Sequence, residues 1–157
     1  MKQAHIGIPQ ENIKKIVKLL ENIFADENVL YTKLKNFHWN VVEHNFRDYH
    51  KFLDELAATS LVKIDEIAER VRTLGSFIPA SMDFFLKNAQ LKESHALKKS
   101  GNDMMKELLD DYETQIRDIR KAIEKIEALD DAGTTDFLTQ IMEEKEKQAW
   151  MIRSTIV

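Results

Sequence analysis

Cysteine is absent from this chain of 157 residues, and glycine and proline are scarce, with 4 and 2 residues. Without cysteine the chain can form neither a disulfide nor a thiolate metal site. Any metal ligands must therefore be imidazole or carboxylate groups, which suit iron, manganese or zinc. Because helix-breaking residues are few and leucine, isoleucine, alanine, lysine and glutamate abound, the composition favours long helices.

Long uncharged apolar runs are also missing. No stretch approaches the roughly 18 apolar residues of a membrane span, and the N-terminal segment lacks the continuous apolar run of a signal peptide. We therefore expect a cytoplasmic protein with no membrane segment. Hydrophobic residues make up 43% and charged residues 32%, a balance that at this length predicts one globular domain over residues 1–157.

Four segments show apolar residues at the three- and four-residue steps of an amphipathic helix. The sequence predicts four long helices, over about residues 10–39, 46–74, 101–128 and 136–155. Gly75 is expected to end the second helix, and Thr134 or Thr135 to cap the fourth. Ser81 is expected to cap a short helix within the connection of about 25 residues between the second and third helices.

No segment shows the alternating pattern of a strand. The predicted fold class is therefore all-α, a four-helix bundle with a short extra helix in its long connection. A connection of that length can cross over and join two parallel neighbouring helices, as it does in ferritin-like bundles.

The second long helix carries two pairs of candidate metal ligands. His50 and Asp54 are four residues apart, and Asp65 and Glu69 have the same spacing. Residues four apart lie on one face of a helix, and the step from Asp54 to Asp65 returns to within about 20° of the same direction. All four side chains therefore form one stripe. The rise of the helix nevertheless separates the pairs by about 16 Å, far beyond metal–ligand bonds of about 2 Å.

A second copy of the helix, packed antiparallel across a two-fold axis, would bring the pairs together. The His50–Asp54 pair of one subunit would face the Asp65–Glu69 pair of the other, which gives two equivalent sites per dimer. His38, at the end of the first helix, would complete the histidine-rich half. The chain has no Glu-x-x-His motif, with which such bundles hold two irons inside one subunit, and this favours a site at an interface.

The alternative interpretation of the stripe is a solvated or salt-bridged helix face. Carboxylates on a helix usually face water, and Asp65 and Glu69 would then pair with Lys63, Arg70 or Arg72. Periodicity alone leaves both interpretations open.

The segment NFHWNVVEHNFRDYHKFLDEL, followed by KIDEIAERVRTLG, resembles the two signature regions of the Dps family of ferritin-like mini-ferritins, the DNA-protection-during-starvation proteins. The resemblance covers nearly the whole chain from about residue 10, and five ligands match in type and spacing. It implies a hollow shell of twelve subunits with iron sites at two-fold interfaces. His38, His50 and Asp54 would come from one subunit, and Asp65 and Glu69 from its partner.

The resemblance also implies a ferroxidase, which oxidises Fe(II), preferably with hydrogen peroxide, and stores Fe(III) inside the shell. Such a protein protects the cell from oxidative damage. The ligand types suit this chemistry, because carboxylates tolerate Fe(III) and imidazole suits Fe(II). Trp39 would lie beside the iron site, where it either contacts a ligand water, intercepts an oxidising equivalent or packs at the interface.

Two positions depart from the family pattern. Glu43 stands where glycine is usual, and Tyr49 stands where leucine is usual. Neither change removes a ligand. Glu43 is expected to alter the loop conformation, since glycine often serves where φ is positive. Tyr49 is expected to contribute packing, with a redox role beside the metal as the alternative.

The family name raises DNA binding as an alternative function, with metal binding secondary. The sequence argues against it, because the formal net charge is −4 and Lys2 is the single basic residue before the first helix. We also expect no basic tail after the last helix. Neutralising phosphates needs clustered cations, and only local pairs such as Lys14–Lys15 and Lys98–Lys99 are present. A third interpretation is a plain oligomeric bundle whose stripe is a salt-bridged interface.

Overall fold

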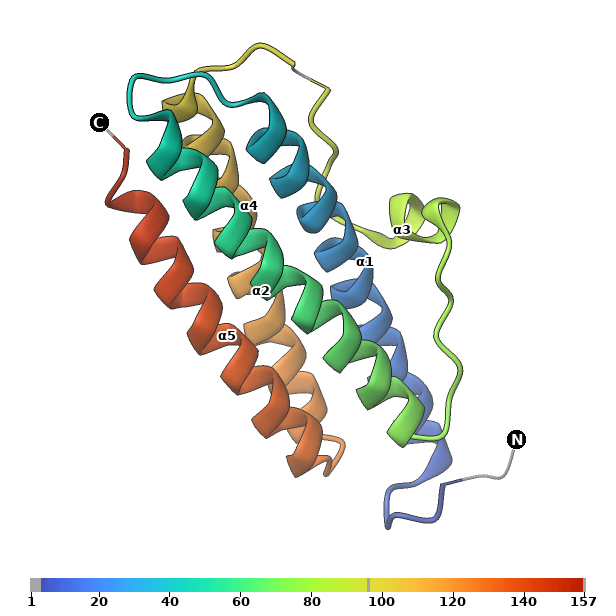
Figure 1. Ribbon diagram of the computed structural model, residues 1–157. Coiled ribbons are helices and arrows are strands. Elements are labelled where there is room, and N and C mark those ends of the chain that lie inside the picture. Colours follow the sequence, from blue (N-terminus) through green and yellow to red (C-terminus); the bar gives the residue numbers. More distant parts are fainter. Residues whose placement is uncertain (1–3, 96, 157) are drawn as a thin grey trace.

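The computed structural model describes residues 4–95 and 97–156, and within these residues it contains five helices and no strand (Figure 1). The helices are α1 (Gln10–Asn40), α2 (Phe46–Thr73), α3 (Met82–Asn88), α4 (Gly101–Glu127) and α5 (Ala132–Arg153). The predicted all-α bundle with a short helix in its long connection is confirmed. Among the described residues, every helix is too short or too polar to cross a membrane.

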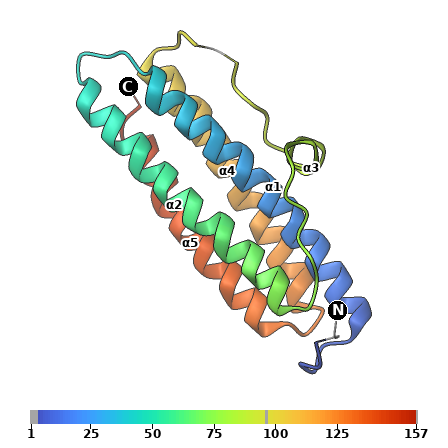
Figure 2. The same cartoon turned by 45° about the vertical axis from the view of Figure 1, so that its right-hand side comes forward.

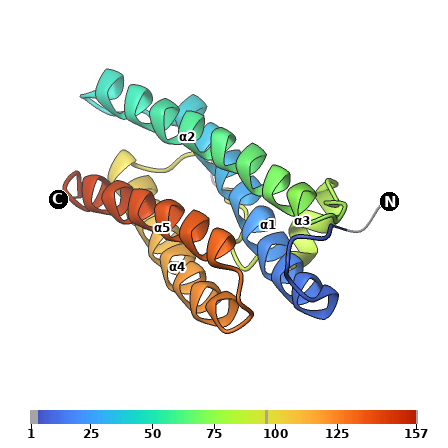
Figure 3. The same ribbon diagram turned by 90° about the horizontal axis from the view of Figure 1, so that it is seen from below.

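The long helices form two antiparallel hairpins. α1 packs against α2 and α4 packs against α5, and the two hairpins lie over one another as layers (Figures 1 and 3). The connection from α2 to α4 passes outside α1, where α3 rests, so that α2 and α4 run in the same direction (Figure 2). Across the layers α1 faces α4 and α2 faces α5. The expectation of parallel neighbours was therefore wrong: the crossover joins parallel helices at opposite corners of the bundle.

Helix ends follow local side-chain chemistry. Gly75 has a φ of 85° directly after the C-cap residue of α2, a left-handed conformation that glycine adopts without strain. At α3 the Ser81 side chain accepts a hydrogen bond from the Phe84 N–H, as predicted for a cap.

The start of α5 differs from the prediction. The helix begins at Ala132, and its N-cap is Asp131 rather than Thr134 or Thr135. The Asp131 carboxylate accepts the Thr134 N–H at 2.9 Å and also pairs with Arg70 of α2 at 2.9 Å. Because aspartate satisfies both donors at once, the helix starts at Ala132, four residues before the predicted start at Asp136.

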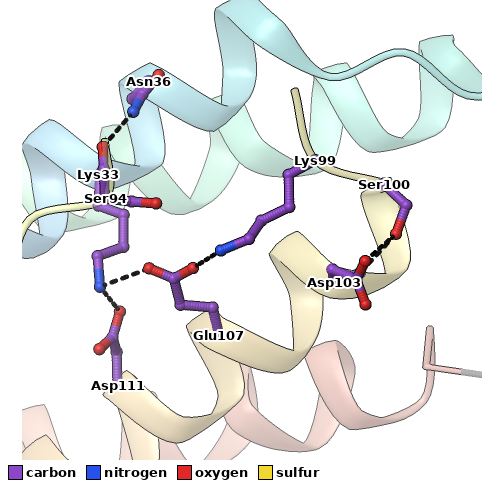
Figure 4. A network of polar contacts seen from close by, with 8 residues as sticks. All are labelled: Lys33, Asn36, Ser94, Lys99, Ser100, Asp103, Glu107 and Asp111. Carbon is purple, nitrogen blue, oxygen red and sulfur yellow. Dashed lines mark hydrogen bonds and ion pairs between the residues drawn. The ribbon is translucent and has the colours of Figure 1, made fainter. Parts of the chain in front are cut away.

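Ion pairs fasten the connection to the bundle close to the end of α1 (Figure 4). Lys33 of α1 is 4% exposed, and its Nζ lies 2.6 Å from Asp111 Oδ2 and 3.2 Å from Glu107 Oε1 on α4. Lys99, in the connection, pairs with the same Glu107. Since a buried charge is stable only when it is paired, this network holds α1, the connection and α4 together beside the turn of α1 that precedes His38.

Candidate metal centre

The structure places the five predicted ligands in two groups at opposite ends of α2. His38, at the end of α1, lies beside His50 and Asp54 near the start of α2. Asp65 and Glu69 lie about three turns further along the same helix. One chain thus brings three of the ligands together and leaves two apart. Within the described residues, no three histidine, aspartate or glutamate side chains gather closely enough to hold a metal ion.

His38 and His50 fix each other through reciprocal hydrogen bonds. Nδ1 of His38 lies 2.9 Å from the carbonyl oxygen of His50, and Nδ1 of His50 lies 2.9 Å from the carbonyl oxygen of His38. Because a carbonyl can only accept, each Nδ1 carries the proton, and in the neutral ring Nε2 keeps a free lone pair. The rings stack with centroids 3.8 Å apart. This tautomer, with Nε2 unprotonated, is one in which imidazole can bind a metal ion.

Asp54 is the third candidate ligand at this end of α2, and its carboxylate already forms an ion pair with Lys35. Its Oδ1 lies 3.8 Å from His38 Nε2 and 2.9 Å from the Nζ of Lys35, one turn earlier on α1. The hydrogen bond from Lys35 holds the pKa of Asp54 below its usual value, so Asp54 remains a carboxylate. Lys35 Nζ also lies 5.5 Å from the centre of the Trp39 ring. A metal ion that binds Oδ1 of Asp54 would compete with this ammonium.

Lys35 is the residue beside the candidate ligands that the sequence reasoning missed. It precedes His38 by three residues, a spacing that places both side chains on the same face of α1. That spacing was the available signal. It could not show that the lysine would reach across to Asp54 on another helix.

Asp65 and Glu69, at the other end of α2, are exposed. Within the part of the chain that the structure describes, neither carboxylate forms an ion pair or a side-chain hydrogen bond. The cations that a salt-bridged surface would use are engaged elsewhere. Lys63 pairs with Glu66 and Glu144. Arg70 is occupied too, by Asp131 and Thr134, and Arg72 donates to the carbonyl of Ser76. The expected pairing of Asp65 and Glu69 with Lys63, Arg70 or Arg72 is therefore wrong for the single chain, in which both carboxylates face solvent.

Between the two groups, the outward face of α2 is apolar. Leu61 and Val62 are each 52% exposed, and Ala58 is exposed one turn before them. Side chains of this size gain free energy when they are covered, about 1.5–3 kcal/mol for a fully buried leucine or valine. The stripe thus consists of two polar ends and an uncovered apolar middle.

The unusual Glu43 and Tyr49 meet at the start of α4. Glu43 Oε1 accepts the Gly101 N–H at 2.7 Å, which satisfies one of the free donors of the first turn of that helix. A Cβ on Gly101 would lie 2.8 Å from Glu43 Cγ and 3.1 Å from the Tyr49 ring, so any larger residue there would displace these side chains. The loop between the two histidines is therefore tied to α4, and the expected packing role of Tyr49 agrees with this contact.

Known proteins share this architecture. Residues 17–157 match the family model for the ferritin-like domain, and the chain belongs to that family. A Dps protein from Vibrio cholerae, described as a member of a broad superfamily of ferritin-like diiron-carboxylate proteins, superposes with a TM-score of 0.92 at 29% identity, over 98% of this chain and 96% of that one. DNA protection during starvation protein 2 of Bacillus anthracis is 36% identical over 90% of this chain and 96% of its own.

A further relative is an uncharacterized low temperature-induced protein of Nostoc sp., 40% identical over 99% of this chain and 88% of its own. Within the ferritin-like proteins the chain is thus a member of the Dps family of mini-ferritins, which confirms the resemblance seen in the sequence.

Proposed function

We propose that the protein is a ferroxidase and an iron store. Fe(II) is its substrate and hydrogen peroxide its preferred oxidant, and Fe(III) collects inside a hollow shell of twelve subunits. His38, His50 and Asp54 of one subunit act with Asp65 and Glu69 of a second copy. The observation that carries this proposal is the division of α2 into a preformed nitrogen-rich end, an apolar middle and an end with free carboxylates.

An antiparallel dimer joins the two ends. If the two-fold axis passes between residues 59 and 60 of α2, His50 faces the second copy's Glu69, and Asp54 faces its Asp65. The same axis brings each Leu61 against the α2 helix of the other copy. One arrangement therefore completes both metal sites and covers the exposed apolar middle.

The residues divide the chemistry between them. Two Fe(II) ions give one electron each to hydrogen peroxide, whose O–O bond breaks, and two protons complete two water molecules. Nε2 of His38 and His50 donate lone pairs, which suit Fe(II). The carboxylates of Asp54, Asp65 and Glu69 supply negative charge, which stabilises Fe(III) more than Fe(II) because the Coulomb energy grows with the charge of the ion. The site therefore favours the oxidised product.

Mixed assemblies test whether two subunits share a site. His50→Ala destroys the histidine half and Asp65→Asn the carboxylate half, so each variant alone should oxidise Fe(II) with peroxide only at the background rate. A hetero-dimer of the two variants contains one fully intact site. Co-refolding equal amounts should therefore restore about a quarter of the wild-type rate, because half of the dimers are mixed and each has one intact site of two.

Absorbance of ferric iron after peroxide addition gives the rate. As a control, His50→Ala co-refolded with the double variant His50→Ala/Asp65→Asn should recover nothing, because no mixed dimer then has an intact histidine half. Activity that stays at background in the complementary mixture, while native mass shows mixed assemblies, would contradict a shared site.

A further inference from the structure

A polar layer crosses the core of the bundle. Each long helix contributes one residue to it: Glu27 of α1, Ser60 of α2, Gln115 of α4 and Lys145 of α5. None of the four is more than 3% exposed. The layer divides the apolar core into two separate clusters, one toward the start of α1 and the other toward its end.

Glu27 is the centre of the layer. Ser60 Oγ donates to its Oε1 at 2.7 Å, and Lys145 Nζ lies 2.7 Å from its Oε2. Gln115 Nε2 donates to the same Oε2 at 3.3 Å. Both carboxylate oxygens are therefore satisfied by donors from three other helices, although Glu27 is 0% exposed.

The layer also contains a hydrogen-bond acceptor without a donor among the described residues. Gln115 Oε1 is buried and receives no hydrogen bond from any described residue. Lys145, by contrast, has one bonded oxygen for its three N–H donors, and its Nζ lies 5.2 Å from the centre of the buried Tyr112 ring. Acceptor oxygens and an aromatic face around a single positive group are the surroundings that bind a cation.

Ferritin-like di-iron proteins bind their metal inside the bundle, with a glutamate from each of two helices and a Glu-x-x-His motif from each of the other two. The polar layer of this chain holds one carboxylate, that of Glu27, while Ser60, Gln115 and Lys145 stand on the other three helices. One carboxylate without an imidazole does not fit two iron ions. The ammonium of Lys145 supplies the positive charge instead.

We propose that the centre of the bundle is a cation site whose occupant is the ammonium of Lys145. The lysine closes the interior of each chain to metal ions and leaves the outward stripe of α2 as the place where iron binds. Stability alone does not account for the layer, because apolar residues of similar volume are often as stabilising as a buried ion pair, or more so.

Replacing the occupant tests the site directly. Lys145→Ala removes three methylene groups and the ammonium, which together correspond to propylammonium. The variant leaves the Glu27 carboxylate unpaired in the core, and its melting temperature should fall by about 10 °C. Propylammonium chloride should restore several degrees in a saturable manner, whereas tetramethylammonium chloride at equal ionic strength should restore none because it has no N–H donor.

Glu27→Gln/Lys145→Ala is the matched control. It removes both charges, so it should melt above Lys145→Ala and should not respond to propylammonium. Closure to metal is tested by Lys145→Glu in a His50→Ala/Asp65→Asn background, in which the α2 stripe is disabled. This variant, refolded with Co²⁺, should bind one ion per chain, seen in visible absorption, whereas the background protein binds none.

Two results would overturn the proposal. One is a Lys145→Ala protein that melts like the wild type or ignores propylammonium. The other is Lys145→Glu without bound Co²⁺. Neither measurement involves iron oxidation, so a failure here leaves the proposed ferroxidase site untouched, and a failure of that site leaves this inference untouched.

Discussion

The two ends of α2 hold their candidate ligands in opposite ways. At one end, His38 and His50 are held by hydrogen bonds to each other's backbone, and Lys35 neutralises Asp54. At the other end, Asp65 and Glu69 are exposed and have no partner among the described residues. The histidine end takes its geometry when the chain folds. The carboxylate end acquires its geometry only from what binds to it.

This difference matches what each ligand type does best. Imidazole offers one lone pair in a fixed direction, so fixing the ring in advance reduces the entropy lost on binding. A carboxylate offers two oxygens and can turn between one and two contacts. Two carboxylates four residues apart also repel, by about 0.2–0.5 kcal/mol on a helix surface. The carboxylate end is therefore slightly strained alone and is relieved by a cation.

Disrupting the apolar middle of α2 should separate the subunits and so abolish the iron oxidation that needs both ends of the helix. Leu61→Glu places two negative charges near each other at the expected two-fold axis, and like charges at an interface cost several kcal/mol. Native mass should show loss of the assembly, and peroxide-driven iron oxidation should fall to background. Circular dichroism should stay helical, because Leu61 is half exposed in the single chain.

Leu97→Glu, the same change at another exposed leucine, serves as the control and should keep both the assembly and the activity. A Leu61→Glu protein of wild-type mass and rate would mean that the middle of α2 is not the interface.

Single-ligand variants should separate the two ends. His50→Ala and Asp65→Asn should each slow iron oxidation by about a hundredfold or more, since even neighbours of metal ligands contribute 10–100-fold. Their stabilities without metal should differ. His50→Ala removes the hydrogen bond from the His50 ring to the His38 carbonyl and the stacking of the two rings, and should lower the free energy of unfolding by about 1–2 kcal/mol. Asp65→Asn removes a repulsive charge and should leave it unchanged or slightly higher.

Urea unfolding in chelator measures these free energies. Glu55→Gln, an exposed carboxylate change on α2 that is not part of the ligand stripe, should alter neither rate nor stability appreciably. Equal losses of stability in His50→Ala and Asp65→Asn would remove the distinction between a preformed end and an open one.

Helical periodicity accounts for what the sequence could predict of this site. A fixed turn and rise convert residue spacing into geometry, so the stripe of four ligands on α2 followed from the sequence alone. His38 needed the family resemblance, because its approach to His50 depends on how two helices pack. Lys35 was missed for the same reason, and so was the diagonal placement of α2 and α4. The Glu27–Lys145 pair joins distant parts of the chain, and no local pattern marks either residue as buried.

Removing the Lys35 ammonium should leave the Asp54 carboxylate without a bound cation, as Asp65 and Glu69 are at the other end of α2. Lys35→Met keeps most of the side-chain stem but frees Asp54 Oδ1, so Zn²⁺ used as a probe should bind about tenfold more tightly by calorimetry. The pKa of Asp54 should rise toward its usual value, because the hydrogen bond from Lys35 is the largest cause of its lowering. Lys35→Arg, which keeps the charge, is the control, and weaker Zn²⁺ binding by Lys35→Met would contradict the displacement of this ammonium.

A buried carboxylate away from both ends of α2 makes the stability of the folded chain depend on pH, so variants at the two ends must be compared at one pH. Asp26 of α1 is 4% exposed, and burial raises its pKa to about 6. Its Oδ1 accepts the N–H groups of Gln90 and Leu91 at 2.7 and 2.9 Å. Because the folded pKa lies above the unfolded value of 3.8, the charged form is disfavoured by folding. Stability from this group is therefore greatest below about pH 4 and declines as pH rises through about 6.

Asp26→Asn should reduce the loss of stability that accompanies the rise in pH from about 4 to above 6. The amide oxygen can still accept both N–H groups, and no charge is buried, but the new N–H groups need an acceptor. We expect a net gain of about 1 kcal/mol at pH 8 and none at pH 4, from urea unfolding at both values. A variant that is destabilised at pH 8 would show that Asp26 is held as a favourable anion, contrary to the cost of burying its charge.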